Sequence, residues 1–175
     1  MGRLIFIIGG ARSGKSRFSV ELAKEKGKKV LFIATCSPKD EEMKKRIQKH
    51  KRSRPAGWKV VEGYRKISAV LNRHANNFDT IIIDCLGLFV TNLMMNRVRD
   101  KAIEKEITLI ANRLLKSKTD IIVVSNEVGG GIVPDNPLAR RFRDVLGISN
   151  QIMAGHADTV YMMQAGIPIK IKEQV

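Results

Sequence analysis

The chain has 175 residues, of which 43% are hydrophobic, and it carries a formal net charge of +15. This size and composition predict one globular domain over 1–175 and show no compositional break that would indicate a second. The charge indicates an anionic partner, but one Trp, two Tyr and six Phe leave little for a base-stacking platform, so we expect nucleotide rather than nucleic-acid binding.

Cysteine and apolar content narrow the class of protein further. Cys36 and Cys85 form no C-x-x-C pair and lack the spacing of metal ligands. The sequence therefore predicts neither a disulfide framework nor a zinc site, and it fits a reducing, cytoplasmic location. No apolar stretch approaches the length of a membrane span, so none is expected.

A glycine-rich loop follows the first predicted strand, Leu4 to Ile8, and fits the pattern G-x-x-x-x-G-K-[ST]. The backbone N–H groups of such a loop cradle a polyphosphate, Lys15 reaches its β- and γ-phosphates, and Ser16 can ligate Mg²⁺. A helical pattern over 17–26 adds the positive end of a helix dipole. The alternative is an ordinary glycine-rich turn. The predicted phosphate-binding loop consists of Gly9, Gly10, Ala11, Arg12, Ser13, Gly14, Lys15 and Ser16.

Further short apolar runs recur, with helical patterns in most of the intervals, at 30–33, 80–83, 121–124 and 159–162. Together with the loop, this alternation predicts an α/β P-loop fold of the RecA-like kind, with a mostly parallel sheet flanked by helices. Gln164-Ala165-Gly166 separates the last run from residues 167–172, which predicts an antiparallel hairpin at one edge. Ligands of such sheets lie beyond the carboxyl ends of the strands, so the residues after each run are candidate site residues.

The segment from Lys39 to Pro55 is predicted to be helical, because acidic residues crowd its start and basic residues its end. His50 falls on one face of this helix with Met43 and Ile47. Such a histidine is usually structural. The alternative is a neutral imidazole that attacks phosphorus while nearby cations clamp the phosphates. These cations are Lys49, Lys51, Arg52 and Arg54.

Three other features belong to the candidate site or to its surroundings. Asp84 follows the run 80–83, where P-loop proteins usually keep a carboxylate for Mg²⁺ or its water shell; a base or a ribose contact is equally open. The alternative is a plain acidic residue at the end of a strand. His74 and His156 are interpreted as surface histidines. Residues 129–137 predict a flexible loop on the ligand side, ending in a helix cap at Asn136.

Longer blocks of the sequence are more specific than the loop. They run from Arg46 to Trp58, from Asp84 to Leu93, from Asn126 to Asp144, and through Asn150-Gln151 to Gly166-Ile167-Pro168. With the phosphate-binding loop, they resemble the bifunctional adenosylcobinamide kinase/adenosylcobinamide-phosphate guanylyltransferase family of cobalamin biosynthesis over nearly the whole chain. Two positions depart from this family: Gly87 stands where a threonine is common, and Asp84 is a glutamate in some members.

The resemblance implies a two-step enzyme. ATP or GTP would phosphorylate the aminopropanol hydroxyl of adenosylcobinamide, and GTP would then donate GMP to that phosphate through a histidine-GMP phosphoramidate. The position that matches this histidine is His50. The implied assembly is a homo-oligomer, a trimer with sites between subunits. Beyond the loop residues 9–16, the implied GTP site consists of Ala34, Thr35, Cys36, Lys51, Arg52, Ser53, Arg54, Glu62 and Asp84.

Two other functions remain compatible with the residues themselves. The first is a P-loop kinase of another small alcohol, in which His50 is structural. The second is a nucleotide-regulated module that recruits nucleic acid through its basic surface, and it predicts salt-sensitive oligonucleotide binding.

Overall fold

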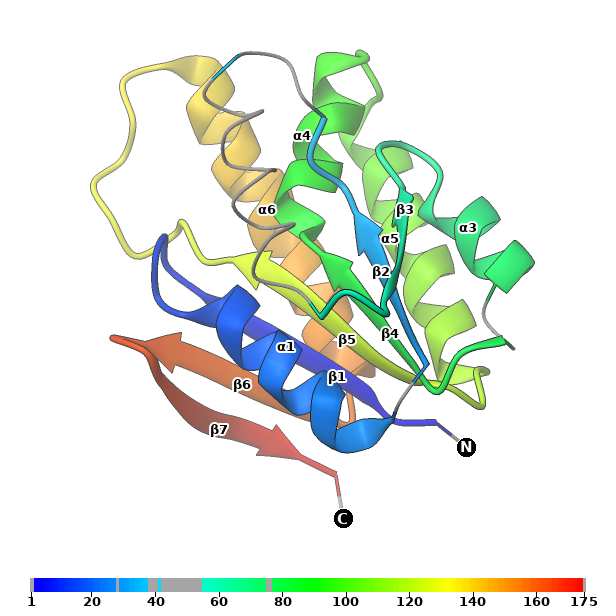
Figure 1. The fold of residues 1–175 in the computed structure, drawn as a ribbon. Helices are drawn as coiled ribbons and strands as arrows, with labels where there is room; N and C mark the ends of the chain where they lie inside the picture. The colour runs from blue at the N-terminus through cyan, green and yellow to red at the C-terminus, as the bar shows by residue number, and fades with distance from the viewer. Residues whose placement is uncertain (1, 28, 38–40, 42–54, 75–76, 175) are drawn as a thin grey trace.

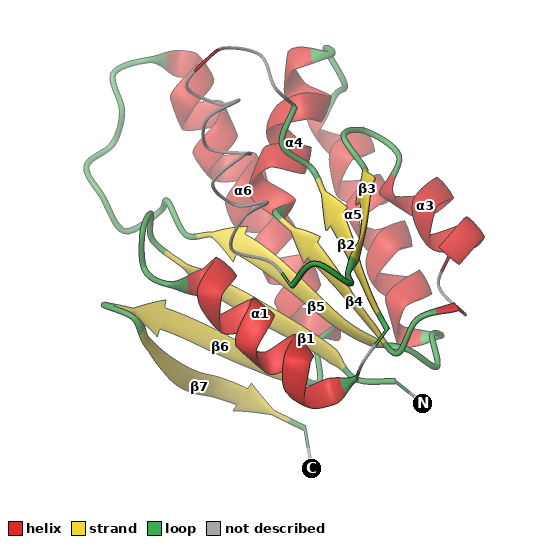
Figure 2. Cartoon of the chain, in the orientation of Figure 1, coloured by secondary structure: helices red, strands yellow, loops and turns green. Residues whose placement is uncertain are grey.

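The computed structural model describes residues 2–27, 29–37, 41, 55–74 and 77–174. Figures 1 and 2 show a twisted sheet with helices against both of its faces. The described helices are α1 (Lys15–Lys26), α3 (Ile67–His74), α4 (Leu86–Met95), α5 (Asp100–Leu115) and α6 (Pro137–His156). The described strands are β1 (Leu4–Gly9), β2 (Val30–Ala34), β3 (Lys59–Glu62), β4 (Thr80–Asp84), β5 (Asp120–Asn126), β6 (Thr159–Gln164) and β7 (Ile167–Glu173).

The seven strands form one sheet in the order β3-β2-β4-β5-β1-β6-β7. All neighbours are parallel except β6 and β7, which are antiparallel. Strands β1, β2, β4 and β5 consist largely of buried Ile, Val, Leu and Phe, as expected where a parallel strand is covered on both faces. The predicted mostly parallel sheet with an antiparallel edge is therefore confirmed.

Side chains alternate between two apolar layers. Ile33 and Ile83 join the larger core cluster, which contains the buried residues of α3, α4, α5 and α6. Phe32 and Ile82 join the smaller cluster, against which Phe18 and Leu22 of α1 pack. Of the helices that the structure describes, α1 alone covers this second face (Figure 2). Because Asp84 follows Ile82 by two residues, its side chain lies on the α1 face.

The C-terminal hairpin differs from its prediction by one residue. Gln164 extends β6 and pairs with Ile167, which leaves Ala165 and Gly166 as a two-residue turn. Both turn residues have positive φ, 50° and 85°, as the tightest hairpin turns require.

Two sequence predictions concern helix ends. The Asn136 side chain accepts hydrogen bonds from the amides of Leu138 and Ala139 at 2.8 and 3.3 Å, so the predicted cap of α6 is confirmed. The helix predicted for residues 39–55 lies almost entirely outside the described residues. No helix in the described ranges is long and apolar enough to span a membrane.

Candidate functional site

The glycine-rich loop joins β1 to α1 at the carboxyl end of the sheet (Figure 1). Lys15 is the first residue of α1 and is only 7% exposed. Its ammonium donates to the carbonyl oxygen of Gly10 and lies 3.4 Å from the Ser13 hydroxyl. Gly14 has a φ of 94°, which a residue with a side chain rarely adopts. The loop therefore closes around a buried cation, as a polyphosphate cradle requires.

Strand register brings the predicted carboxylates to the same edge. Glu62 pairs with Ala34, and Ala34 pairs with Asp84, so these residues end three neighbouring parallel strands at one level. On the other side, Gly9 pairs with Asn126 and starts the phosphate loop. Residues from distant parts of the sequence thus line one edge because their strands end together.

Thr35 lies at the centre of this edge and is fully buried. Its amide donates to the Asp84 carbonyl at 3.1 Å. Its hydroxyl donates to the Cys85 carbonyl and accepts from the Cys85 amide, both at 2.7 Å. The Thr35 hydroxyl is thereby bound to the backbone that follows β4, and it holds the end of β2 against the start of α4.

Asn92 of α4 adds a second connection. Its side-chain amide donates to the Thr35 carbonyl at 2.8 Å and to the Tyr64 carbonyl at 3.0 Å. The residue is 6% exposed in a helix that is otherwise mostly apolar. Asn92 is not among the site residues predicted from the sequence, although a lone amide in such a helix is the signal that could have identified it. It ties together the segments that follow β2 and β3.

Two ionisable groups at this edge have shifted pKa values. Burial, then the hydrogen bond to Glu62 and the electrostatic effects of Glu62 and Cys36 raise the pKa of the Tyr64 phenol. Burial and the neighbouring charge of Asp84 raise the pKa of the Cys85 thiol to about 12, although Lys15 acts in the opposite direction. Both groups are consequently neutral near pH 7, and neither serves as a nucleophile there.

The loop after β5 is attached to the phosphate loop at its base. The Glu127 amide donates to the Gly9 carbonyl at 2.9 Å. The Glu127 carboxylate accepts from the amides of Gly129 and Gly130 at 2.6 and 3.3 Å. At its far end, Arg140 donates to the carbonyls of Pro134 and Asp135. Both ends of the segment predicted to be flexible are thus fixed by hydrogen bonds.

The described histidines lie away from this edge. His74 ends α3 and contacts Phe78 edge-on, shortly before the amino end of β4. His156 is the last residue of α6 and lies 2.8 Å, through its Nδ1, from the Ile152 carbonyl. Both are at the opposite ends of the strands from the phosphate loop. The candidate residues His50, Lys51, Arg52, Ser53 and Arg54 lie outside the described residues.

The space around Gly87 does not by itself require glycine. A Cβ atom there would meet Leu146 at 3.6 Å and the Asn126 side chain at 3.7 and 3.8 Å. These are ordinary van der Waals contacts, so nothing in the described packing explains the departure at this position.

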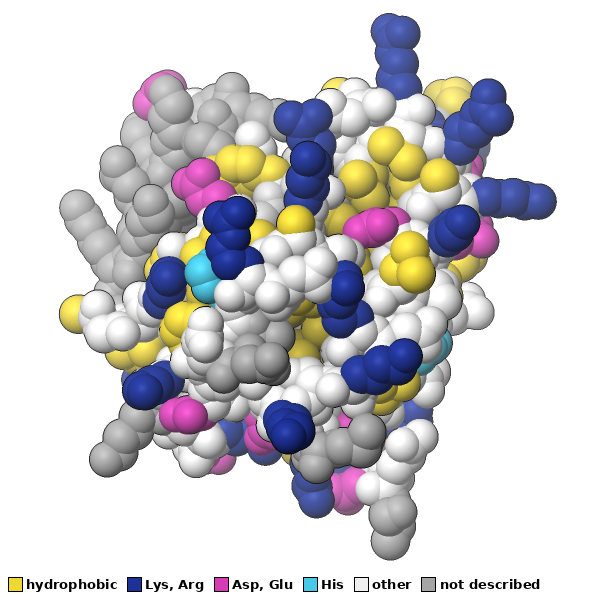
Figure 3. Space-filling model, turned by 90° about the vertical axis from the view of Figure 1, so that its right-hand side faces the viewer, with side chains coloured by type: hydrophobic (Ala, Val, Ile, Leu, Met, Phe, Trp, Pro, Cys, Tyr) yellow, Lys and Arg dark blue, Asp and Glu magenta, His cyan; other side chains and the backbone are white. Residues whose placement is uncertain are grey.

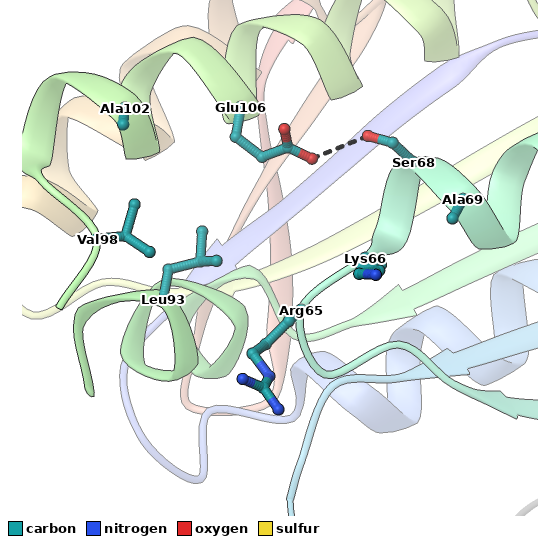
Figure 4. A pocket seen from close by; sticks show the side chains of 8 residues that line it. All are labelled: Arg65, Lys66, Ser68, Ala69, Leu93, Val98, Ala102 and Glu106. Carbon is teal, nitrogen blue, oxygen red and sulfur yellow. Dashed lines mark hydrogen bonds between the residues drawn. The ribbon is translucent and has the colours of Figure 1, made fainter. Parts of the chain in front are cut away.

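A separate pocket of about 330 Å³ opens between α3, α4 and α5 (Figure 4). Its wall is largely apolar, and the Ser68 hydroxyl donates to Glu106 at 2.9 Å inside it. It contains none of the predicted site residues. On the face shown in Figure 3, Lys and Arg side chains are scattered among neutral and hydrophobic ones instead of gathering in one block.

The donor set available for Mg²⁺ is small. The described residues contain no group of three or more His, Cys, Asp or Glu that could enclose a metal ion. Ser16 at the start of α1 and Asp84 at the end of β4 supply two oxygen donors on the α1 face. This set fits Mg²⁺, which commonly takes one or two protein oxygens and completes its shell with phosphate and water.

Two solved structures share this fold at low sequence identity. The RadB recombinase superposes with a TM-score of 0.52 at 15% identity, covering 92% of this chain and 74% of that one. PH0250 from Pyrococcus horikoshii OT3 superposes with a TM-score of 0.59 at 9% identity, covering 99% and 88%. The RecA-like P-loop fold predicted from the sequence is confirmed by this likeness.

Closer sequence relatives cover nearly the whole chain. It is 38% identical to the bifunctional adenosylcobalamin biosynthesis protein CobU of Salmonella typhimurium, over 97% of this chain and 99% of that protein. It is 38% identical to the corresponding protein CobP of Pseudomonas aeruginosa, over 95% of each. The family model described as cobinamide kinase / cobinamide phosphate guanyltransferase matches residues 5–171. The chain therefore belongs to the cobinamide kinase / cobinamide phosphate guanyltransferase family.

Proposed function

We propose that this chain phosphorylates adenosylcobinamide and then transfers GMP from GTP to adenosylcobinamide phosphate, with ATP or GTP as the phosphate donor of the first step. The observation that carries the proposal is the closed phosphate loop around Lys15, at the edge where β4 and β3 end in Asp84 and Glu62, in a chain of this family. A nucleotide bound by the loop would lie on the α1 face, beside both carboxylates.

The phosphate loop supplies charge stabilisation in both reactions. When a triphosphate enters, the Lys15 ammonium exchanges its contact with the Gly10 carbonyl for phosphate oxygens, and the loop amides donate to the same oxygens. The dipole of α1 adds to this field. Because these groups are already in place, little reorganisation is needed as charge develops on the departing phosphate.

In the second reaction, His50 acts as the nucleophile. Its neutral imidazole attacks the α-phosphorus of GTP; a P–N bond forms, the bond from α-phosphorus to the bridging oxygen breaks, and pyrophosphate leaves. A phosphate oxygen of adenosylcobinamide phosphate then attacks the same phosphorus, and the P–N bond breaks. Lys51, Arg52 and Arg54 follow His50 in the sequence and would balance the phosphate charge.

Mg²⁺ would be held by the Ser16 hydroxyl and the Asp84 carboxylate. When bound, it would neutralise charge on the phosphate oxygens. Thr35 orders this part of the site from within the protein, because its hydroxyl fixes the backbone that follows Asp84.

The test is incubation with GTP labelled at the α-phosphate. We expect the wild-type protein to retain acid-labile label and His50→Asn to retain none. Full labelling of His50→Asn would overturn the nucleophile assignment. Phosphate transfer to adenosylcobinamide without any protein-bound GMP would instead favour a kinase that lacks the second activity.

The proposed assembly is a homotrimer with the sites between subunits. Large hydrophobic side chains exposed on the described surface support an interface: Ile132 is 97% exposed in the loop after β5, and Ile167 and Ile171 of β7 are 63% and 58% exposed. Sedimentation equilibrium would measure the mass directly, and a monomer at micromolar concentration would contradict this assembly.

A further inference from the structure

The turn between β6 and β7 lies directly against the phosphate loop, although the two segments are far apart in sequence. The Gly166 amide donates to the Ser13 carbonyl at 3.1 Å. A Cβ atom added at Gly14 would lie 3.2 Å from the Gly166 Cα and 3.6 Å from the Met163 side chain. The two backbones therefore touch at the middle of the loop.

The same hairpin also encloses the start of the loop. A Cβ atom at Gly9 would lie only 2.5 Å from the Met163 carbonyl oxygen, a distance that real Cβ atoms do not show. From the opposite side, the Glu127 amide donates to the Gly9 carbonyl. The loop is thus held between β5 on one side and the hairpin on the other.

The conformation of the turn directs the contact with Ser13. Ala165 and Gly166 both have positive φ, which matches a two-residue hairpin turn with glycine in its second position. A Cβ atom at Gly166 would also come within 3.4 Å of the Arg17 guanidinium in the first turn of α1. The turn consequently touches both the phosphate loop and the helix that follows it.

We infer that Met163 and the Ala165-Gly166 turn are positioning residues for the nucleotide triphosphate. This inference rests on the proposed function only in that the loop binds a nucleotide. None of the three residues is required to touch phosphate. A glycine-rich loop is flexible by itself, so a hydrogen bond that fixes the Ser13 carbonyl lowers the entropy cost of presenting the loop amides to phosphate.

The test is Gly166→Ala, with binding of Mg²⁺ and guanosine 5′-(α,β-methylene)triphosphate measured by calorimetry without corrinoid. This analogue cannot transfer GMP, so the measurement reports binding alone. The variant places a side chain at a φ of 85° and disturbs the contact with Ser13. We expect the Kd to rise about tenfold, the loss that corresponds to one hydrogen bond.

A matched control separates this effect from a general loss of stability. Gly147→Ala places the same methyl group in α6, where no described atom lies within 4 Å, and leaves the Kd unchanged. Met163→Leu is the second variant, to be used if Gly166→Ala does not fold. It keeps the turn but shortens the side chain that faces Gly14, and we expect it to raise the Kd as well.

A second readout follows the contact itself. Analogue binding should shift the amide resonance of Gly166 in the wild-type protein, because the Ser13 carbonyl it donates to belongs to the occupied loop. If folded Gly166→Ala binds the analogue with the wild-type Kd, the inference is overturned and the proposed function is unaffected. If Gly166→Ala does not fold, a wild-type Kd in Met163→Leu has the same meaning. A wild-type protein that does not bind the analogue at all would overturn the nucleotide site itself.

Discussion

The two faces of the sheet are built for different tasks. The face covered by α3, α4, α5 and α6 is a continuous apolar layer, in which Phe89, Ile107 and Leu146 are completely buried. On the α1 face the apolar cluster is smaller, and the strands end in polar residues such as Asp84 and Glu62. Most of the buried hydrophobic side chains therefore lie on the four-helix face, and the polar strand ends lie on the α1 face, where we propose that the charged ligand binds.

This difference between the two faces predicts what a substitution on each face should change. A change in the four-helix layer should alter stability and spare the activity of molecules that remain folded. A change at the loop on the α1 face should do the reverse. Residues such as Asn92, which extends from α4 to the strand ends, should affect both. The following predictions test this division, from the largest expected effect to the smallest.

Lys15→Met should have the largest effect on activity. We expect kcat/KM for GTP to fall about 10³-fold, roughly 4 kcal/mol, because the cation that meets the phosphates is lost. The melting temperature should change little, since the ammonium's hydrogen bonds to Gly10 and Ser13 lie within the same loop. Lys24→Met, at an exposed position of the same helix, is the control and should retain full activity. Equal losses in both variants would contradict a specific role for Lys15.

Ile107→Ala should have the converse effect. Ile107 of α5 is completely buried in the four-helix layer, so the cavity should lower the free energy of unfolding by about 3 kcal/mol. Urea denaturation measures this loss, and initial rates per folded molecule should match the wild type. A reduced kcat in fully folded protein would show that the two faces are not independent.

Asn92→Leu should reduce both stability and nucleotide affinity. The carbonyls of Thr35 and Tyr64 would lose their donor inside the protein, at a cost of about 2 kcal/mol in the free energy of unfolding. The KM for GTP should rise because the segments after β2 and β3 lose their common anchor. Thr91→Val is the matched control on the same helix. The Thr91 hydroxyl donates to the Gly87 carbonyl one turn earlier, within the helix itself, so little change is expected. An unaltered KM in Asn92→Leu would limit that residue to stability.

Acid should weaken a contact remote from the site. Burial acts to raise the pKa of Asp120, but hydrogen bonds from the Arg3 amide and from Lys26 outweigh it and lower the pKa. A lowered pKa in the folded state stabilises the protein above the unfolded value of about 4, and this stabilisation is lost as the pH falls through the folded pKa. Asp120→Asn should therefore flatten the fall in stability below about pH 4, with GTP turnover at pH 7 unchanged. If the free energy of unfolding of the wild type and of Asp120→Asn falls equally with decreasing pH, Asp120 does not contribute to the loss of stability in acid.

The elements of the fold could be predicted because their signals are local. The apolar run of β1, the glycine pattern after it and the basic end of α1 are three separate signals, and each one is contained in a short stretch of neighbouring residues. The strand order could not be predicted, since nothing in the sequence of β1 specifies that β5 and β6 are its neighbours. The length of the hairpin turn was wrong by one residue because Gln164 is compatible with both strand and turn.

The candidate site could be predicted from the sequence only where a local motif indicates it. The phosphate loop and Asp84 follow from pattern and position alone. Asn92, Met163 and Gly166 act through contacts between distant segments, which no periodicity reveals. The nucleophilic role of His50 came from family resemblance, because spacing within a helical segment describes a structural histidine equally well, and it stays a prediction.

The position of β1 within the sheet has a consequence for synthesis of the chain. β1 is synthesised before the two strands with which it pairs, β5 and β6, which come much later in the sequence. Until residues beyond Thr159 have emerged, the phosphate loop lacks a flanking strand and its hairpin support. During synthesis, the phosphate loop is therefore held from both sides only after β6 and β7 have emerged, so nucleotide binding can assist folding most strongly from that point onward.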